Sequence, residues 1–385
     1  MPDHHDAEDR NRTVATTMAE AAESLLAALD GEQRARATFG FDDAERRLWF
    51  YTPTNHGGLP LVDMDVMQHR LVWRLLATGL SVAGYNTTAV IVGQDNILDR
   101  IEGFQVDFDR DRGRDPMAYW VAVFGQPGSV GRWGWRFGGH HVSVHFTVVD
   151  GAVVSATPCF LGSDPASAPL LGPHLHRPLG GVEDLGRELA RSLDGEQAAA
   201  AIVSAAAPSD IVTVNRTTLV DGDNVLGLPY VWRGRFEAAI DQLMARMQAD
   251  LERSLGGTTD ELEALAFSTR PKGLAAASMR SDQRELLREL LFTYVGRIHD
   301  DLADAQMAQL DGRFEDLHFL WAGSLDPMHP HYYRVQGGDL FVEYDNAARG
   351  GNHVHTVWRD LSVDFGGDPL AAHYVGAPRS HGHSH

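Results

Sequence analysis

Apolar residues recur at helical spacing in several parts of the chain. In the segment 63–79, "DMDVMQHRLVWRLLATG", they form one helical stripe, and Ser81 is placed to cap a second helix directly afterwards. The segment 281–305 shows the same spacing, and helical patterns extend from about 182 to 206 and from 229 to 306. These patterns predict amphipathic helices early in the chain and again in its second half.

A different pattern, of alternating or continuous apolar residues punctuated by glycine and proline, predicts β-strands. Asp150 and Gly151 give a hairpin-turn signal between two such runs. The expected strand regions are 48–53, 118–125, 133–151, 152–162, 314–323, 331–338, 340–346 and 352–366. Strands therefore precede and follow a helical region instead of alternating with single helices.

This order of elements predicts an α+β fold. We expect a mixed, mostly antiparallel sheet with flanking helices and a helical insertion at about 182–310. The expected organisation is one domain over residues 13–375, with a polar, flexible tail at 1–12 and a disordered, histidine-rich tail at 376–385. No internal repeat is apparent in the sequence.

Composition and charge narrow the classes of protein. The 385 residues carry a net charge of −20, and 43% of them are hydrophobic, which suffices for a large core. The negative charge argues against nucleic acid or an anionic membrane as a partner. The single cysteine, Cys159, excludes an intrachain disulfide and a thiolate metal cluster. Without an apolar stretch of membrane-spanning length, we expect a cytoplasmic protein, of open oligomeric state.

Histidines interrupt one of the expected strands, "GGHHVSVHFTVV" at 138–149. Because side chains alternate along a strand, His141 and His145 share one face while His140 lies on the other. The two glycines that precede His140 permit a bulge, which could bring His140 and His141 to one site. This stretch is therefore a candidate metal site, although each histidine could also be an ordinary core residue.

A second group of polar residues lies near the end of the chain. His353 and His355 are two positions apart, so that on a strand both imidazoles reach one ion. Glu343 and Asp345 share a face of the preceding strand in the same way. If the two strands form an antiparallel hairpin with Asp345 opposite His353, Glu343 lies opposite His355, and all four side chains converge.

These two groups together predict a divalent transition metal, such as Zn²⁺, Fe²⁺ or Cu²⁺. Its ligands would be His140 or His141 together with His353 and His355. A catalytic site keeps a coordination position open for water or substrate, whereas a structural site is closed. Whether His145, His331 or His373 joins the site is left open.

The neighbouring polar and aromatic residues provide candidates for catalysis and substrate binding. Glu343 and Asp345 are the candidate catalytic carboxylates, with Glu343 as a base or a further ligand. Arginine offers a rigid fork for an anionic group, and aromatic rings line apolar pockets, although both also serve in ion pairs and sheet packing. The candidate substrate-binding residues are Arg136, Arg334, Arg359, Trp135 and Tyr333.

The function expected from these residues is that of a metal-dependent enzyme. It would act on a small or peptide-like molecule, either through a metal-activated water or by oxidation. The alternative is a non-enzymatic ligand-binding protein, with a structural metal site or a metal-free pocket of histidines and aromatic residues.

Several segments together resemble an uncharacterised bacterial family, the domain of unknown function 3500. They include "WFYTP", "DPMAYWVAVFGQPG", "WGWRFGGHHVS", "TPCFLGSDPA", "HYYRVQGG", "FVEYDN" and "NHVHTVWRD", and the resemblance extends over about 40–375. It implies a bacterial protein of this size, secreted or cytoplasmic, and no specific activity. It also implies that the pairs His140–His141 and His353/His355 belong to the family signature, whereas asparagine often stands at the position of His145.

Overall fold

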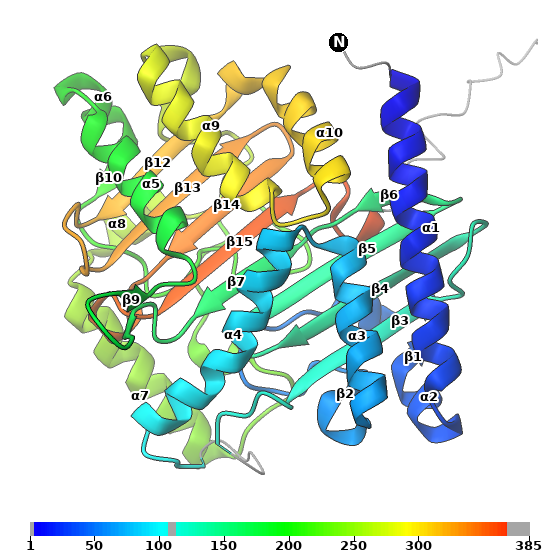
Figure 1. Cartoon of the computed structure of the whole chain (residues 1–385). Coiled ribbons are helices and arrows are strands. Elements are labelled where there is room, and N and C mark those ends of the chain that lie inside the picture. Colours follow the sequence, from blue (N-terminus) through cyan, green and yellow to red (C-terminus); the bar gives the residue numbers. More distant parts are fainter. Residues whose placement is uncertain (1–3, 107–112, 368–385) are drawn as a thin grey trace, which may run out of the picture.

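The computed structural model describes residues 4–106 and 113–367, and these form an α+β fold around one large sheet, as expected (Figure 1). In this part of the chain the sheet has 13 strands, and neighbouring strands are mostly antiparallel. Its main path, in spatial order, is β1 (Thr38–Phe39), β3 (Tyr119–Gly125), β4 (Arg132–Gly139), β5 (Val142–Val149), β7 (Cys159–Ser163), β15 (Val354–Asp360), β14 (Leu340–Asp345), β13 (His331–Gly337), β12 (His318–Gly323) and β10 (Ile202–Ser204). The short strands β2 (Leu59–Pro60), β6 (Ala152–Ser155) and β11 (Leu274–Ala275) pair alongside this path, and β8 (Ala168–Pro169) pairs with β9 (Leu175–His176) separately.

Long helices cover one face of the sheet (Figure 1). They are α1 (His4–Ala28), α3 (Val66–Gly79), α4 (Val82–Ile101), α5 (Gly180–Ser192), α9 (Ser281–Val295) and α10 (Asp300–Asp311). The main core lies between these helices and the sheet, and strand alternation sends Val142, Val144 and Phe146 into it. Within the described residues, no helix is both long and apolar enough to cross a membrane.

The opposite face of the sheet carries two smaller apolar clusters, beneath loops and two helices, α7 (Ala238–Leu255) and α8 (Thr259–Leu265). Side chains on the odd-numbered positions of β15 and β5, such as Val357 and Ser143, point to this face. The polar residues that the sequence singles out lie mainly on this side, because the helix-covered face is filled by apolar residues.

The two halves of the sheet repeat each other, which corrects the expectation that the chain has no repeat. The strand order reads alike from either end, and β7 and β15 meet as antiparallel neighbours at the centre. Each half begins with a long helix, a short helix (α2, Gly31–Ala37, or α6, Gly195–Ala201) and an end strand in parallel pairing. Two helices and an antiparallel meander then follow in both halves.

Matching side chains support this duplication. Gln33 and Gln68 complete the capping boxes of α2 and α3, and Gln33 Nε2 donates to Gln68 Oε1 at 3.0 Å. Gln197 and Gln283 repeat this arrangement in α6 and α9, also at 3.0 Å. Each half thus uses a glutamine pair to fasten a short helix to the next long helix.

The duplication also changes the interpretation of the expected helical insertion. Residues 182–204 and 274–310 of this segment belong to elements that have counterparts in the first half. The extra material is narrower: residues 205–273, between β10 and β11, which carry α7 and α8. The corresponding stretch of the first half, between β1 and β2, is only residues 40–58.

The expected flexible tail at 1–12 is wrong for the residues that the structure describes. Residues 4–12 belong to α1, and Asn11 exchanges two hydrogen bonds with the backbone of Val153, at 3.0 and 2.7 Å. This pairing attaches the start of the helix to β6. The expected tail at 376–385 lies outside the described residues.

His331 makes the stability of the fold depend on pH. Its ring stacks between Trp321 and Tyr344, and burial lowers its pKa from 6.5 to about 4. Between these pH values the unfolded chain binds a proton that the folded chain does not, so stability present above pH 6.5 is lost as the pH falls towards 4.

We expect His331→Phe to reduce the loss of stability between pH 7 and pH 4.5 by about 2–3 kcal/mol. The free energy of unfolding in urea, measured at both pH values, gives this difference for each protein. An equal loss of stability in the variant and in the unchanged chain would show that the pH dependence does not come from His331.

Candidate metal centre

His140 and His141 form the two-residue turn between β4 and β5, where the sequence predicts a bulged strand. Gly139 pairs with Val142 in regular register, so that no bulge forms there. His141 has a φ of +62°, a left-handed conformation that costs a non-glycine residue about 1–2 kcal/mol. Two backbone hydrogen bonds hold it, from His141 N to Tyr51 O at 2.9 Å and from Gly162 N to His141 O at 2.8 Å. The turn therefore fixes the direction of the His141 ring.

The register of β14 and β15 differs from the expected one by two residues. Asp345 lies opposite His355, and Glu343 lies opposite Val357. A shift of two positions keeps every side chain on its face, so Glu343, Asp345 and His355 share one face as expected. His353 lies just before the first residue of β15, at the end of this central strand.

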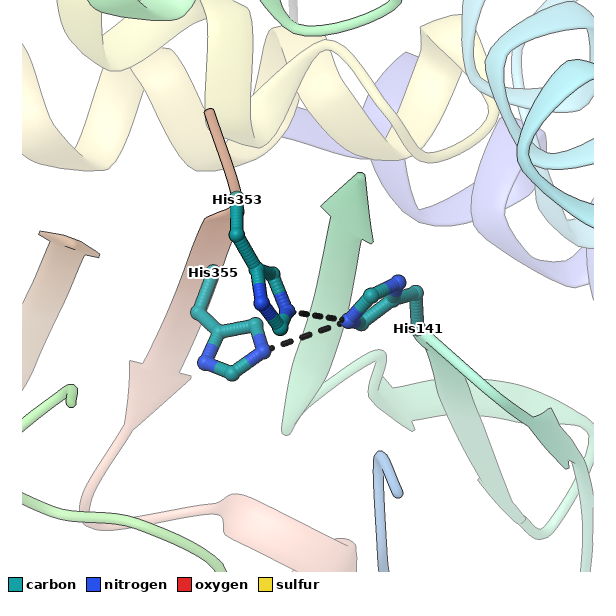
Figure 2. Close-up of side chains that lie close together, drawn as sticks. All are labelled: His141, His353 and His355. Atoms are coloured by element: carbon teal, nitrogen blue, oxygen red, sulfur yellow. Dashed lines mark hydrogen bonds between the residues drawn. The ribbon is translucent and has the colours of Figure 1, made fainter. Parts of the chain in front are cut away.

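Three imidazoles meet where the turn approaches the start of β15, and we call His141, His353 and His355 the histidine cluster (Figure 2). His141 Nε2 lies 2.8 Å from His353 Nε2 and 3.3 Å from His355 Nε2. Nitrogen ligands at 2.0–2.1 Å from a tetrahedral ion are about 3.3 Å apart. These two distances, and the grouping of one ligand atom from each of the three histidines within 4.8 Å, therefore suit one shared transition-metal ion.

A missing side chain in β7 makes this meeting possible. Gly162 lies opposite His355, and a Cβ on it would be 2.8 Å from His141 Cδ2 and 2.8 Å from Val354 O. The His141 ring reaches across the strand through this space. Glycine is thus required here by a close approach of side chain and backbone.

Carboxylates orient two of the three rings from behind. His355 Nδ1 donates to Asp210 Oδ1 at 2.7 Å, and Asp210 Oδ2 accepts a hydrogen bond of 2.8 Å from the Tyr51 hydroxyl. His353 Nδ1 lies 3.6 Å from Asp164 Oδ2. A proton held on Nδ1 leaves the electron pair of Nε2 facing the cluster, which is the usual arrangement of metal-binding histidines.

His140 packs beside the cluster and does not join it. Its ring centroid is 3.8 Å from that of His141, and its Nδ1 is bonded to Asp95 Oδ1 at 2.6 Å. Its Nε2 lies 3.5 Å from Arg114 Nη1. Of the four expected metal ligands, three therefore converge on one point and His140 supports one of them.

Burial keeps two members of the cluster, His141 and His353, uncharged. It lowers the pKa of His141 and of His353 well below the usual value, and the neighbouring imidazoles lower both further. Burial also raises the pKa of Asp164 to about 6, although Arg349 and Arg114 act in the opposite direction. Neutral imidazoles have the free electron pairs that a metal ion needs.

The cluster forms one wall of a cavity of about 620 Å³. Its polar end also contains Arg114, Arg349 and Glu102, and Glu102 accepts hydrogen bonds from Arg114 Nε at 2.8 Å and from Arg349 Nη2 at 2.6 Å. Arg349 Nε donates to Asp164 at 2.9 Å. An ion held by the three histidines would face this cavity, which is large enough for a small-molecule ligand.

The two expected catalytic carboxylates do not line the cavity. Glu343 is fully buried and accepts hydrogen bonds from Val212 N, Thr213 N and the Tyr332 hydroxyl at 2.8, 3.2 and 2.6 Å, and another from the Thr213 hydroxyl. It anchors the loop that carries Asp210.

Asp345, the other expected catalytic carboxylate, is buried close to the histidine cluster but does not line the cavity. Its Oδ1 accepts a hydrogen bond from Ala347 N at 3.0 Å, and burial raises its pKa well above the ordinary value. With Asp210 and His355 it forms a second group whose ligand atoms lie within 4.8 Å of one another. Asp345 thus backs the histidine cluster from inside the sheet.

The three arginines expected to bind substrate lie away from the cavity, in buried pairs that hold loops to the sheet. Burial leaves no route for a ligand to them, and each already donates hydrogen bonds within the protein, with Arg334 Nη1 as a buried donor that has no partner. Their partners are Glu45 for Arg136, at 2.7 Å, the Tyr332 hydroxyl for Arg334, at 2.9 Å, and Asp364 for Arg359, at 2.7 Å.

The two aromatic candidates lie on the helix-covered face, because strand alternation points them away from the histidines. Trp135 stacks on Phe146 with ring centroids 4.7 Å apart, and the Tyr333 hydroxyl is 2.7 Å from that of Tyr294. Both belong to the main core.

The remaining histidines have other places. His145 bonds to the Ser143 hydroxyl at 3.0 Å and does not line the cavity, and His331 is buried among aromatic rings. His373 lies outside the described residues. Four residues of the site were not predicted from the sequence: Asp164, Asp210, Arg114 and Arg349. Only Asp164 had a signal, its place directly after an expected strand in "GSDPA".

The chain matches the family model described as a protein of unknown function (DUF3500) over residues 11–367. It belongs to this family. The match covers both halves of the sheet and all three members of the histidine cluster, which confirms the resemblance found in the sequence and extends it to α1. No curated protein and no solved structure matches the chain.

Proposed function

We propose that this DUF3500 protein is a metal-dependent enzyme whose ion is held by His141, His353 and His355. The observation that carries the proposal is the convergence of three Nε2 atoms, at 2.8 and 3.3 Å, in the wall of the cavity. Three protein ligands leave one coordination position for water or substrate, whereas structural sites use four. The cavity beside this position supports a small-molecule substrate over a purely structural ion.

Hydrolysis is the reaction class that the surroundings favour. An ion with three imidazole ligands lowers the pKa of a bound water and so provides a nucleophile at neutral pH. Asp164 lines the cavity next to His353, and its Oδ1 is buried without a hydrogen-bond partner. That oxygen is available to accept a hydrogen bond from such a water or from the substrate.

A substrate panel tests this proposal. The protein is loaded with Zn²⁺, Fe²⁺ or Mn²⁺ and assayed against aryl and acyl esters and amides, before and after treatment with a chelator. We expect turnover that depends on the metal, returns when it is added back and is lost in His353→Ala. If a substrate is converted only in the presence of oxygen and is not hydrolysed, the proposed reaction class is oxidation and not hydrolysis. Stoichiometric metal without metal-dependent turnover of either kind would overturn the enzyme proposal.

The carboxylate behind His355 offers a second test. Asp210→Asn removes the charged acceptor of the His355 Nδ1 proton, and we expect it to weaken Zn²⁺ binding about 10–100-fold. A competing chelator titration measures the change, with the exposed Asp304→Asn on α10 as the matched control. Equal affinities of the two variants would contradict the role of Asp210.

A further inference from the structure

We propose that the substrate of this centre is an acyl ester or amide with an elongated apolar chain, whose carbonyl end lies at the histidine cluster and whose chain lies along α7. The inference rests on the proposed hydrolytic function. In the reaction, the acyl carbon–oxygen or carbon–nitrogen bond breaks. Water supplies the hydroxyl group to the acyl carbon and a proton to the leaving group.

The cavity has a polar end and an apolar end. The three histidines, with Asp164, Asp210 and the paired arginines, occupy the polar end. Residues 51–53 and Ala348 add to the lining, but most of the rest of it comes from residues 205–273, the extra segment of the second half, and is apolar apart from Ser209 and Gln248. Its apolar members are Leu226, Leu228, Val231, Trp232, Leu243, Met247 and Leu251. A ligand that fills both ends must itself be polar at one end and apolar along its body.

Part of this apolar surface, a stripe on α7, remains half exposed and is not used up by packing within the protein. Leu243, Met247 and Leu251 are four residues apart and line the cavity together. Leu243 is 48% exposed and Met247 is 46% exposed, whereas their neighbour Met244 is fully buried in the apolar cluster beneath the helix. The helix is therefore fastened by one face and presents a second apolar face to the cavity.

The dimensions fit a chain of medium length. The eight helical steps from Leu243 to Leu251 rise about 12 Å along the helix, and this is the length of an extended chain of roughly ten carbons. The total volume, about 620 Å³, also accommodates a leaving group at the polar end.

The charges argue against a second anionic group on the substrate. Arg114 and Arg349 line the polar end, but both donate to Glu102, and Arg349 also donates to Asp164. A phosphate or a second carboxylate would have to displace these partners. One polar head at the ion is sufficient, and the body of the ligand remains uncharged.

The duplicated half of the fold provides an internal comparison. A second cavity, of about 520 Å³, lies beside the equivalent turn at 338–339, next to α10 and residues 153–157. Asp339 occupies the position of His141, and Leu361 N donates to Asp339 O at 2.8 Å as Gly162 N does to His141 O. No histidine is among the described residues that line this cavity, and no counterpart of α7 covers it. The equivalent turn thus carries no histidine, and the cavity beside it lies on the helix-covered face, next to Leu302 and Trp358, and not on the face that carries α7.

Straight-chain carboxylates test the proposal, because they are the acyl products of such a reaction. Their dissociation constants for the Zn²⁺-loaded protein are measured by calorimetry from butyrate to dodecanoate. We expect affinity to rise about fourfold per added methylene, up to roughly ten carbons, and then to level off. The double variant Leu243→Ser/Met247→Ser should flatten this dependence while the metal content stays unchanged. Met67→Ser, at an exposed methionine of α3 outside the cavity, should leave it intact.

The outcomes separate this inference from the function on which it rests. Bound metal with no dependence on chain length, or with the same dependence in the double variant, overturns the inference alone. A protein that binds no metal at the cluster overturns both. Because Leu243 and Met247 are half exposed, the double variant should fold, and its metal content verifies this in the same sample.

Discussion

His353→Ala is expected to lower the affinity for Zn²⁺ by more than about a hundredfold. Removing one of the three imidazoles leaves only two protein ligands. Two imidazoles bind the ion much more weakly than three. The loss should exceed that caused by Asp210→Asn, since Asp210 only orients a ligand. Equilibrium dialysis against a competing chelator, with metal measured by mass spectrometry, gives both affinities.

The neighbouring His140 provides the matched control for this change. It lies as close to His141 as any ring of the cluster, but its Nδ1 is bonded to Asp95 and its Nε2 lies near Arg114. We therefore expect His140→Ala to retain Zn²⁺ binding within about tenfold. If His140→Ala and His353→Ala lose the metal equally, the ligand set is not the one proposed.

Glu343→Ala is expected to lower the free energy of unfolding by about 3–5 kcal/mol. The carboxylate accepts hydrogen bonds from two backbone amides and two hydroxyls in a fully buried setting. Alanine leaves Val212 N, Thr213 N and the Tyr332 hydroxyl buried without this acceptor, and each unsatisfied group adds to the cost. Denaturant unfolding at neutral pH measures the loss.

This result separates a structural role of Glu343 from the catalytic role expected from the sequence. The exposed Glu289→Ala on α9 is the control and should change stability by less than about 0.5 kcal/mol. A catalytic base that faces the cavity could be removed with little loss of stability. A change of less than about 1 kcal/mol in Glu343→Ala would therefore contradict the structural role.

Local patterns in the sequence predict the local structure well. The helix expected at 63–79 is α3, and Ser81 caps α4 by accepting a hydrogen bond from Gly84 N at 3.0 Å. The turn expected at Asp150–Gly151 joins β5 to β6. These elements depend on periodicity, capping and turn chemistry, which short stretches of sequence contain in full.

The duplication had a signal that the sequence analysis overlooked. "LDGEQ" occurs at 29–33 and again at 193–197, where Asp30 and Asp194 begin the short helices α2 and α6. Elsewhere the two halves share hydrophobic spacing more than residue identity. The same physical demands, a capped helix packed on a twisted meander, are met by different side chains.

The histidine cluster was predicted in part, because its two components are local in sequence. His-x-His spacing places His353 and His355 together, and a turn or strand presents His141. The choice between His140 and His141 depends on the conformation of the turn, and the partners Asp210 and Asp164 depend on contacts between distant loops. The arginines were wrong as cavity residues because an arginine in a strand gives no sign of whether a carboxylate already holds it.

Anomalous X-ray scattering from crystals soaked in Zn²⁺ or Co²⁺ tests the central claim most directly. The protein is used without residues 376–385, whose histidines could bind metal independently of the cluster. We expect one strong anomalous peak about 2.0–2.2 Å from the Nε2 atoms of His141, His353 and His355. Saturating metal with no peak at this point, and with the three imidazoles still bonded to one another, would contradict the claim.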